Sequence, residues 1–226
     1  MSPVFVHLYT GPHKGQRYYL SKLSSLAGTM DYTDEAALTN LYGEIKTLKL
    51  RHMQHAGAEE KFIHPVLAQR VPGSTIKIEA DHREQERQLN ELISHLEGMR
   101  SDSIDPGKKV ELGLEFYRAL NRFIAYYLIH IDFEEEHLQP TLWALFSSDE
   151  LLGILKDVLS SQSPEEGTWW LSTMLPAMNL NERAGLISAS KNMMPPEVFQ
   201  SRLDLISKRL TPDDWAALKV KLGIDK

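Results

Sequence analysis

Residues 38–62, LTNLYGEIKTLKLRHMQHAGAEEKF, contain the pattern that decides the fold. One residue in every three or four would face the same side of an α-helix, which is the spacing of a buried stripe in a helical bundle. The stripe consists of Leu38, Leu41, Ile45, Leu48, His52, His55, Glu59 and Phe62. It is apolar over its first half and then changes to His, His and Glu. The sequence therefore predicts a long helix that carries ligand-type side chains on one end of its buried face.

Three other segments show inward-facing histidines in the same way, and three of the four stripes also carry carboxylates. We expect the four long helices to span about residues 12–27, 33–64, 75–96 and 108–138. Besides the stripe quoted above, their predicted inward residues are His13, Arg17 (or Gln16), Leu20, Leu23 and Ala27; Glu79, His82, Glu86, Leu89, Ile93 and Leu96; and Phe116, Leu120, Phe123, Tyr127, His130, Glu134 and His137. Thr33 is the expected N-cap of the second helix. Pro65 and Pro140 are expected to end the second and fourth helices. Four long helices with short to moderate links favour an all-α, up-down-up-down four-helix bundle.

The rest of the chain is predicted to form shorter helices with clear start signals. Ser147-x-x-Glu150 has the form of a capping box, and Ser163-Pro164 and Thr211-Pro212 place proline at a first helical position. All nine histidines lie at or before position 137. We therefore expect a metal-binding bundle over residues 1–146 and a helical extension over residues 147–226.

The composition excludes several classes of protein. The chain has 226 residues, a formal net charge of -6 and no cysteine. Without cysteine there can be no disulfide, iron–sulfur cluster, zinc–thiolate site or cysteine nucleophile. The mild acidity argues against a general nucleic-acid partner. No apolar run is long enough to span a membrane, and the first residues do not form a signal peptide, so we expect a cytoplasmic protein.

Carboxylates on buried stripes require a compensating charge. Each buried, unpaired carboxylate would cost several kcal/mol of solvation, and few lysines or arginines lie on these stripes. A metal cation resolves the conflict, because carboxylates and neutral imidazoles are its common ligands. In an antiparallel hairpin of the second and third helices, His55 and His82 would meet at the same level. The donor types permit iron, manganese or zinc.

Other residues near these stripes have less certain roles. A single buried histidine is more often a packing residue than a ligand, so His52 and His137 remain open as ligands. His64 precedes Pro65 and is expected to be structural or to lie just outside the ligand set. His7 and His95 are expected to be ordinary loop or surface residues. In the run Glu134–Glu136, Glu134 fits the inward position and Glu135 is the alternative.

Four segments together resemble the hemerythrin-like (HHE cation-binding) domain over about residues 6–146. They are GPHKGQR at 11–17, HAGAEEKFIHP at 55–65, DH at 81–82 and HIDFEEEHLQP at 130–140. The resemblance implies a four-helix bundle that holds two non-haem iron ions, bridged by carboxylates and an oxo or hydroxo group. It also implies a protein that binds or senses dioxygen, nitric oxide or iron. The implied ligands are His13, His55, Glu59, His82, His130 and Glu134, with Glu59 and Glu134 in the bridging positions.

The sequence departs from this family on the third helix. Many members have a second histidine one turn after the first, and here Glu86 stands at that position. We expect Glu86 to be a further metal ligand. A carboxylate in place of an imidazole adds negative charge, which would favour the ferric state. That change argues against reversible oxygen carriage and favours sensing, oxidase-type chemistry or iron handling.

Three other functions remain open from the sequence. The first is a di-iron oxidase or peroxidase, with Tyr18, Tyr19, Tyr126 and Tyr127 as possible redox partners. The second is ferritin-like iron handling, suggested by Glu79-x-x-His82 and Glu134-x-x-His137 but disfavoured because these lie on consecutive helices. The third is a metal-free helical interaction module. The C-terminal helices could serve as a lid, a homodimer surface or a contact with a protein partner.

Overall fold

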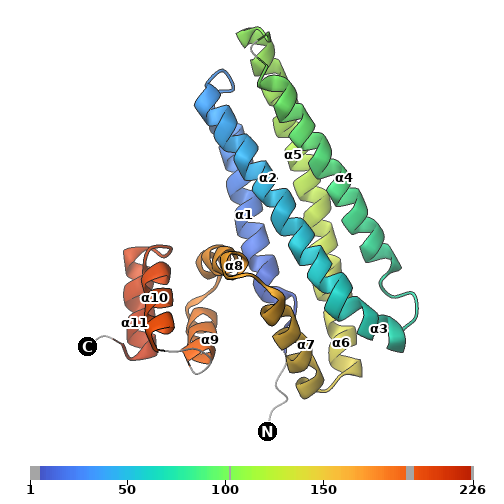
Figure 1. Cartoon of the computed structure of the whole chain (residues 1–226), viewed down its shortest axis with the longest axis vertical. Helices are drawn as coiled ribbons and strands as arrows, with labels where there is room; N and C mark the ends of the chain where they lie inside the picture. The colour runs from blue at the N-terminus through green and yellow to red at the C-terminus, as the bar shows by residue number, and fades with distance from the viewer. Residues whose placement is uncertain (1–5, 102, 192–195, 225–226) are drawn as a thin grey trace. The chain divides into compact units, whose positions relative to one another are not determined.

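The fold is all-helical, as predicted. The computed structural model describes residues 6–101, 103–191 and 196–224, and no strand occurs in these ranges (Figure 1). The long helices are α1 (Thr10–Thr29), α2 (Glu35–Ala58), α4 (Ile76–Met99) and α5 (Pro106–Phe133). They run alternately up and down in Figure 1, which confirms the predicted helical bundle. Within the described ranges, no helix is both long and apolar enough to cross a membrane.

The second and fourth helices do not end where the prolines led us to expect. Helix α2 continues through a π-helical turn, η1 (Glu59–Ile63), into α3 (His64–Arg70). Helix α5 continues in the same way through η2 (Glu134–Leu138) into α6 (Gln139–Leu145). The predicted ends were wrong because each proline falls in the first turn of the following α-helix, where its missing N–H is tolerated.

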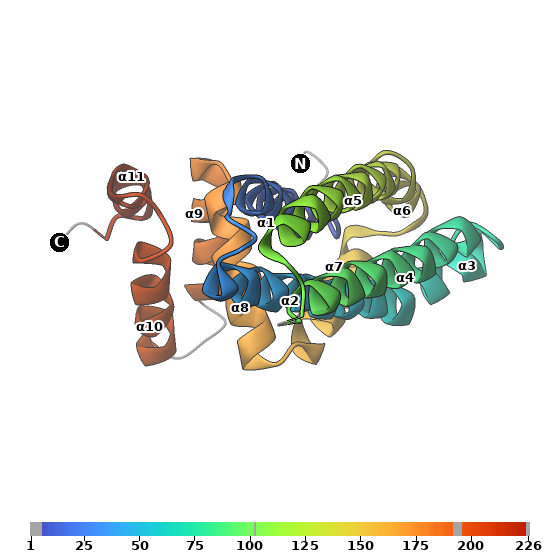
Figure 2. The ribbon, with the colours of Figure 1, turned by 90° about the horizontal axis from the view of Figure 1, so that it is seen from above.

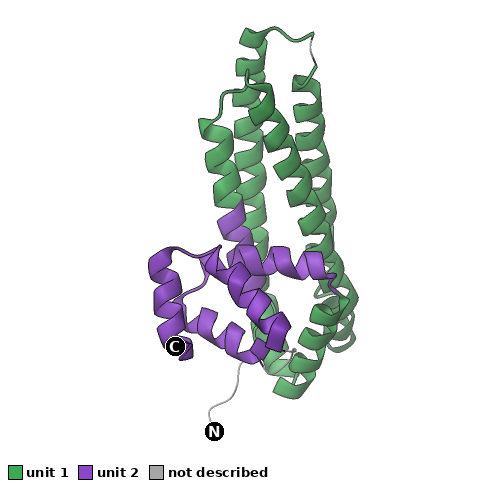
Figure 3. Cartoon of the chain, turned by 60° about the vertical axis from the view of Figure 1, so that its left-hand side comes forward, with its two compact units in different colours: residues 1–8, 20–161 green, residues 9–19, 162–226 purple. Residues whose placement is uncertain are grey.

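The chain forms two compact units (Figure 3). Unit 1 comprises Met1–Leu8 and Leu20–Ser161, and unit 2 comprises Tyr9–Tyr19 and Gln162–Lys226. Helix α1 thus contributes its first half to unit 2 and its second half to unit 1. Helix α7 (Ser148–Ser161) belongs to unit 1. The functional division at residue 146 stays a prediction.

The core of unit 1 is built from the stripes on α2, α4 and α5. Helix α4 packs against both α2 and α5 (Figure 2). The predicted inward residues from Leu38 to His55 on α2 are buried, and so is Glu59 at the start of η1, which confirms this part of the stripe; the last predicted residue, Phe62, is only partly buried. From the second half of α1, Ser24 Oγ donates a hydrogen bond to Asn121 Oδ1 of α5 at 2.7 Å.

Of the six residues of α4 that were predicted to face inward, three are buried and three are not. His82, Leu89 and Leu96 are buried as expected. The intervening buried positions are Ile78, Gln85 and Leu92, where we expected Glu79, Glu86 and Ile93. Two residues that are seven apart lie on one face of a helix, and the buried residue between them can be the third or the fourth after the first. On α4, which packs against both α2 and α5, it is the third.

Helix starts follow the predicted signals with one exception. Asp34, not Thr33, caps α2, and its carboxylate accepts hydrogen bonds from the backbone N–H groups of Ala36 and Ala37. The Thr33 hydroxyl donates to Asp31 instead. The box formed by Ser147 and Glu150 and the caps at Ser163 and Thr211 are confirmed.

Unit 2 has its own apolar core. Its helices are α8 (Pro164–Ala177), α9 (Leu180–Lys191), α10 (Pro196–Ser207) and α11 (Pro212–Leu222). The buried cluster consists of Leu171, Leu175, Ala184, Ile187, Leu203, Ile206, Leu210 and Leu218, and Trp215 packs against it. Arg183 is buried and joins two helix ends: its Nε donates to the Leu175 carbonyl at 2.8 Å, and its guanidinium lies 2.7 Å from Asp214.

Close contact between Gly113 of α5 and Tyr32 predicts that Gly113→Ala destabilises unit 1. A Cβ at position 113 would overlap the Tyr32 ring, and Tyr32 is held by a 2.8 Å hydrogen bond from its hydroxyl to the Ala27 carbonyl. We expect a loss of about 1–3 kcal/mol in thermal or urea unfolding. Gly43→Ala on α2 is the matched control, because a Cβ there meets nothing within 4 Å. The control should gain up to about 1 kcal/mol from helix propensity, and equal effects at both glycines would contradict the packing argument.

The pair of Arg183 and Asp214 predicts a pH-dependent contribution to the stability of unit 2. The hydrogen bond from Arg183 lowers the pKa of Asp214 from its ordinary 3.8. Because the folded-state pKa is depressed, this contribution is complete above about pH 4 and is lost as pH falls through the folded-state pKa. Asp214 is partly exposed and therefore screened, so Asp214→Asn should lower the melting temperature at pH 7 by only about 2–4 °C. The difference between wild type and variant should shrink at pH 3, and a difference that is constant with pH would contradict this assignment.

Candidate metal centre

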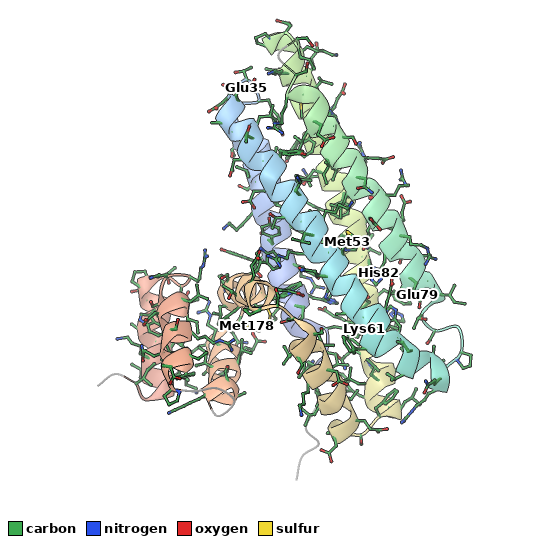
Figure 4. All side chains as sticks on the ribbon, in the orientation of Figure 1. Glu35, Met53, Lys61, Glu79, His82 and Met178 are labelled. Carbon is green, nitrogen blue, oxygen red and sulfur yellow. The ribbon has the colours of Figure 1, made fainter. Side chains whose placement is uncertain are left out.

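Five buried residues of unit 1 bring imidazole nitrogens and carboxylate oxygens together. His55 lies near the end of α2 and Glu59 begins η1, whereas His82 comes from α4 (labelled in Figure 4). His130 lies near the end of α5 and Glu134 begins η2. Glu59 is 2% exposed and Glu134 is 0% exposed. Both carboxylates are therefore inside the bundle, as their stripes predict.

Each carboxylate lies between two imidazoles. Glu59 Oε1 is 3.0 Å from His55 Nε2, and its Oε2 is 3.3 Å from His82 Nε2. Glu134 Oε1 is 3.4 Å from His130 Nε2 and 3.8 Å from His82 Nε2. Glu59, one turn after His55, thus contacts His82 of α4, whereas the predicted meeting of His55 and His82 themselves stays a prediction.

These atoms form two overlapping groups of potential metal ligands. In one group, ligand atoms of His55, Glu59 and Glu134 lie within 4.8 Å of one another. In the other, ligand atoms of His82, His130 and Glu134 do so. Glu134 belongs to both groups, which is the arrangement expected of a carboxylate that bridges two cations.

The separations fit a metal site. Two donors that are each about 2.1 Å from a metal and about 90° apart lie about 3.0 Å from each other. The donor pairs listed above are 3.0–3.8 Å apart. The donor set of imidazole nitrogens and carboxylate oxygens suits iron, manganese or zinc.

Protonation in the cluster compensates for the buried negative charge. Burial acts to raise the pKa of Glu59, but His55 and His82 outweigh it and hold this pKa well below its usual range. Burial acts to lower the pKa of His82, but the carboxylates of Glu134, Glu59 and Glu60 raise it to about 11. For His130, burial dominates and lowers the pKa. Without metal, a protonated His82 therefore compensates for the anionic Glu59.

Both carboxylates begin a π-helical turn, a feature that sequence analysis missed. The backbone N–H of His64 donates to the Glu59 carbonyl, and that of Gln139 donates to the Glu134 carbonyl, each five residues back. Single π turns inside α-helices are frequent at functional sites. The signal was present in the sequence, because His-x-x-x-Glu followed five residues later by His-Pro or Gln-Pro occurs in both helices.

Two of the predicted ligands require separate comment. His13 is fully buried in the part of α1 that belongs to unit 2, with its ring 5.5 Å from that of Tyr9. Glu86 is not brought into the cluster: its side chain is 43% exposed and lies 3.8 Å from Lys49 Nζ. Gln85, which we did not predict as an inward residue, occupies the buried position next to His82 along α4.

The remaining histidines differ in burial. His52 is buried, and its Nε2 lies 3.5 Å from the His82 carbonyl oxygen; burial, with His82 and His55, lowers its pKa to about 3. The buried His64 ring stacks on His82 at 5.8 Å, and its Nδ1 is 3.5 Å from Glu79. His137 is exposed and stacks on Phe133, so the second Glu-x-x-His motif does not point both side chains inward.

An aromatic layer borders the cluster within the bundle. Phe116, Phe123 and Tyr127 are buried on α5, as their stripe predicts. The Tyr127 ring lies 5.6 Å from that of His52 and 6.0 Å from that of His130. The ligand-type residues thus adjoin an apolar interior that can exclude bulk water.

Sequence comparisons identify relatives that share the name F-box/LRR-repeat protein 5. The chain is 28% identical over 171 residues to the F-box/LRR-repeat protein 5 of Xenopus tropicalis, covering 74% of this chain and 24% of that protein. The protein of the same name from Xenopus laevis is 25% identical over 244 residues, covering 96% of this chain and 34% of the relative. That from Bos taurus is 26% identical over 170 residues, covering 74% and 23%. The chain therefore spans about a quarter to a third of the length of these relatives.

The family comparison agrees with the geometry. The model of the hemerythrin HHE cation-binding domain matches residues 4–142, which is more than half of the chain. This range includes every residue of the metal-ligand cluster described above. The chain belongs to the hemerythrin HHE cation-binding domain family.

Proposed function

We propose that this chain binds two iron ions and uses them to bind or sense a small molecule, either dioxygen or nitric oxide, or to sense iron itself. The observation that carries the proposal is the burial of two carboxylates between imidazoles. Glu59 lies between His55 and His82, and Glu134 lies between His130 and His82. Two shared carboxylates flanked by histidines suit two cations better than one. Family membership supports cation binding, and the choice of iron follows from the family resemblance.

The proposed ligands are His13, His55, Glu59, His82, His130 and Glu134. Glu59 and Glu134 would bridge the two ions, since the oxygens of Glu59 face His55 and His82, and Glu134 faces both His82 and His130. Glu86 is left out of this set, because its side chain is half exposed and faces Lys49. His13 is included because it is fully buried and matches the family motif.

The chain's own residues would set the conditions for small-molecule binding. Bound iron would supply a redox-active cation with open coordination positions. The rings of Phe123 and Tyr127 would keep bulk water away from it, and both are buried. The surrounding imidazoles and carboxylates would be held by four helical segments, so the centre would need little rearrangement on loading.

A di-iron oxidase or peroxidase is the second candidate. Tyr127 favours it, because this buried ring lies 6.0 Å from the His130 ring and could exchange electrons with the centre. Turnover of a reductant with dioxygen or peroxide would distinguish an enzyme from a sensor. A role for the C-terminal helices in dimer formation or in binding a protein partner stays a prediction.

The bridging role of the carboxylates predicts the effect of Glu59→Gln and Glu134→Gln. Each change keeps the shape of the side chain but removes a shared anionic ligand, so we expect both ions to be lost or held weakly. Metal addition should stabilise the wild type by about 4 kcal/mol at a free metal concentration 1,000 times the Kd, and this gain should disappear in the variants. Metal content by elemental analysis and melting temperature with and without metal measure the effect.

His137→Ala is the control for these variants, because His137 is exposed and contacts the ring and the carbonyl of Phe133. Its metal content should equal that of the wild type. Full metal content in both carboxylate variants, together with loss of metal in His137→Ala, would show that the ligand assignment is wrong.

The identity of the metal is tested on the aerobically purified full chain. We expect about two iron ions per chain, as in other di-iron carboxylate proteins. We also expect near-ultraviolet ferric absorption that decreases on reduction and changes when nitric oxide is added to the reduced protein. A folded chain that stays free of metal after anaerobic reconstitution with ferrous iron would overturn the proposed function.

A further inference from the structure

We propose that Glu60 and Asp81 are positioning residues that orient His82 and His130 and thereby strengthen the binding of one of the two metal ions. Both carboxylates face the Nδ1 atoms of these imidazoles, on the side away from the shared carboxylates. The inference rests on the proposed two-metal centre. It concerns residues that lie outside the proposed ligand set.

The contact between Glu60 and His82 fixes the orientation of one imidazole. His82 Nδ1 donates to Glu60 Oε1 at 3.0 Å, while Nε2 on the other side of the ring faces Glu59 and Glu134. A hydrogen on Nδ1 leaves the Nε2 lone pair free for a metal. Glu60 directly follows Glu59 in the π turn η1, so one turn supplies both a shared carboxylate and the partner of an opposing ligand.

Asp81 lies on the outer side of His130, near enough to face its Nδ1 but without a hydrogen bond to it. Asp81 Oδ2 lies 3.6 Å from His130 Nδ1, and the His130 Nε2 atom faces Glu134. Lys77 Nζ is 2.6 Å from Asp81 Oδ2, and the Tyr126 hydroxyl donates to Oδ1 at 2.8 Å. These two donors hold the carboxylate in position.

Both pairs act on the same half of the centre. His82 and His130 form one group of ligands with Glu134, whereas His55 and Glu59 belong to the other group. A carboxylate on the outer nitrogen fixes the tautomer and raises the basicity of the inner nitrogen, and its removal typically weakens metal binding 10- to 100-fold. The loss should therefore be confined to one of the two metal ions.

The test uses the metal-free full chain and cobalt(II) in competition with a chromophoric chelator, which resolves two dissociation constants. We expect Glu60→Gln and Asp81→Asn each to raise one of them by about 10- to 100-fold and to leave the other within about threefold. The visible absorption of the bound cobalt should change in the variants. Because the Glu60 side chain is 44% exposed, Glu60→Gln should retain the wild-type melting temperature without metal.

Glu91→Gln is the matched control, because Glu91 lies on α4 with its side chain 64% exposed and pairs with Arg87. It should leave both dissociation constants and the cobalt spectrum unchanged. Unchanged constants in both test variants, or an equal rise in both constants with a lower metal-free melting temperature, would overturn the positioning role. Failure of the wild-type chain to bind cobalt would instead overturn the two-metal centre itself.

Discussion

Burial of Glu59 and Glu134 inside a helical bundle is the constraint on which the rest of the centre depends. An anionic carboxylate in an apolar core is costly unless a positive charge lies against it. Without metal, a proton on His82 meets this need, because its pKa is raised to about 11 between the two carboxylates and Glu60. A divalent cation would replace that proton with a larger charge and would coordinate the inner nitrogens as well. The requirement for charge compensation therefore explains why each buried carboxylate lies between histidines.

The two π turns, η1 after α2 and η2 after α5, share one sequence pattern. Each combines a histidine, a glutamate one turn later and a proline six residues after the glutamate. A proline in an unbroken α-helix clashes with the carbonyl four residues earlier, and the wider turn accommodates the additional residue. The helices continue past the prolines as α3 and α6. In the helix that continues from α5 into α6, the residue before the proline is Gln139, whose side-chain oxygen accepts a hydrogen bond from the Leu8 N–H.

The sequence was most informative where the pattern had one interpretation. On α2 the apolar residues alternate in steps of three and four without a gap, so both the buried face and the level of His55 could be predicted. On α4, His82, Leu89 and Leu96 are seven residues apart, and polar residues, Gln85 and Glu86, fill both candidate positions between the first two. Only packing against α2 and α5 decides that Gln85 and not Glu86 is buried. Helix ends at proline were equally ambiguous, because proline both breaks a helix and starts the next one.

Because the Glu86 side chain is partly exposed and faces Lys49, other carboxylates supply the negative charge next to the proposed ligands. From the sequence we expected a carboxylate ligand on α4, which would favour the ferric state by direct coordination. In the structure, Glu60 and Asp81 lie against the outer nitrogens of His82 and His130 instead. A carboxylate beside the outer nitrogen of an imidazole makes the inner nitrogen a stronger electron donor to a metal. It would favour the ferric state as a carboxylate ligand does, but more weakly and without occupying a coordination position. Such an arrangement would leave a ligand position for a small external molecule, which the proposed function requires.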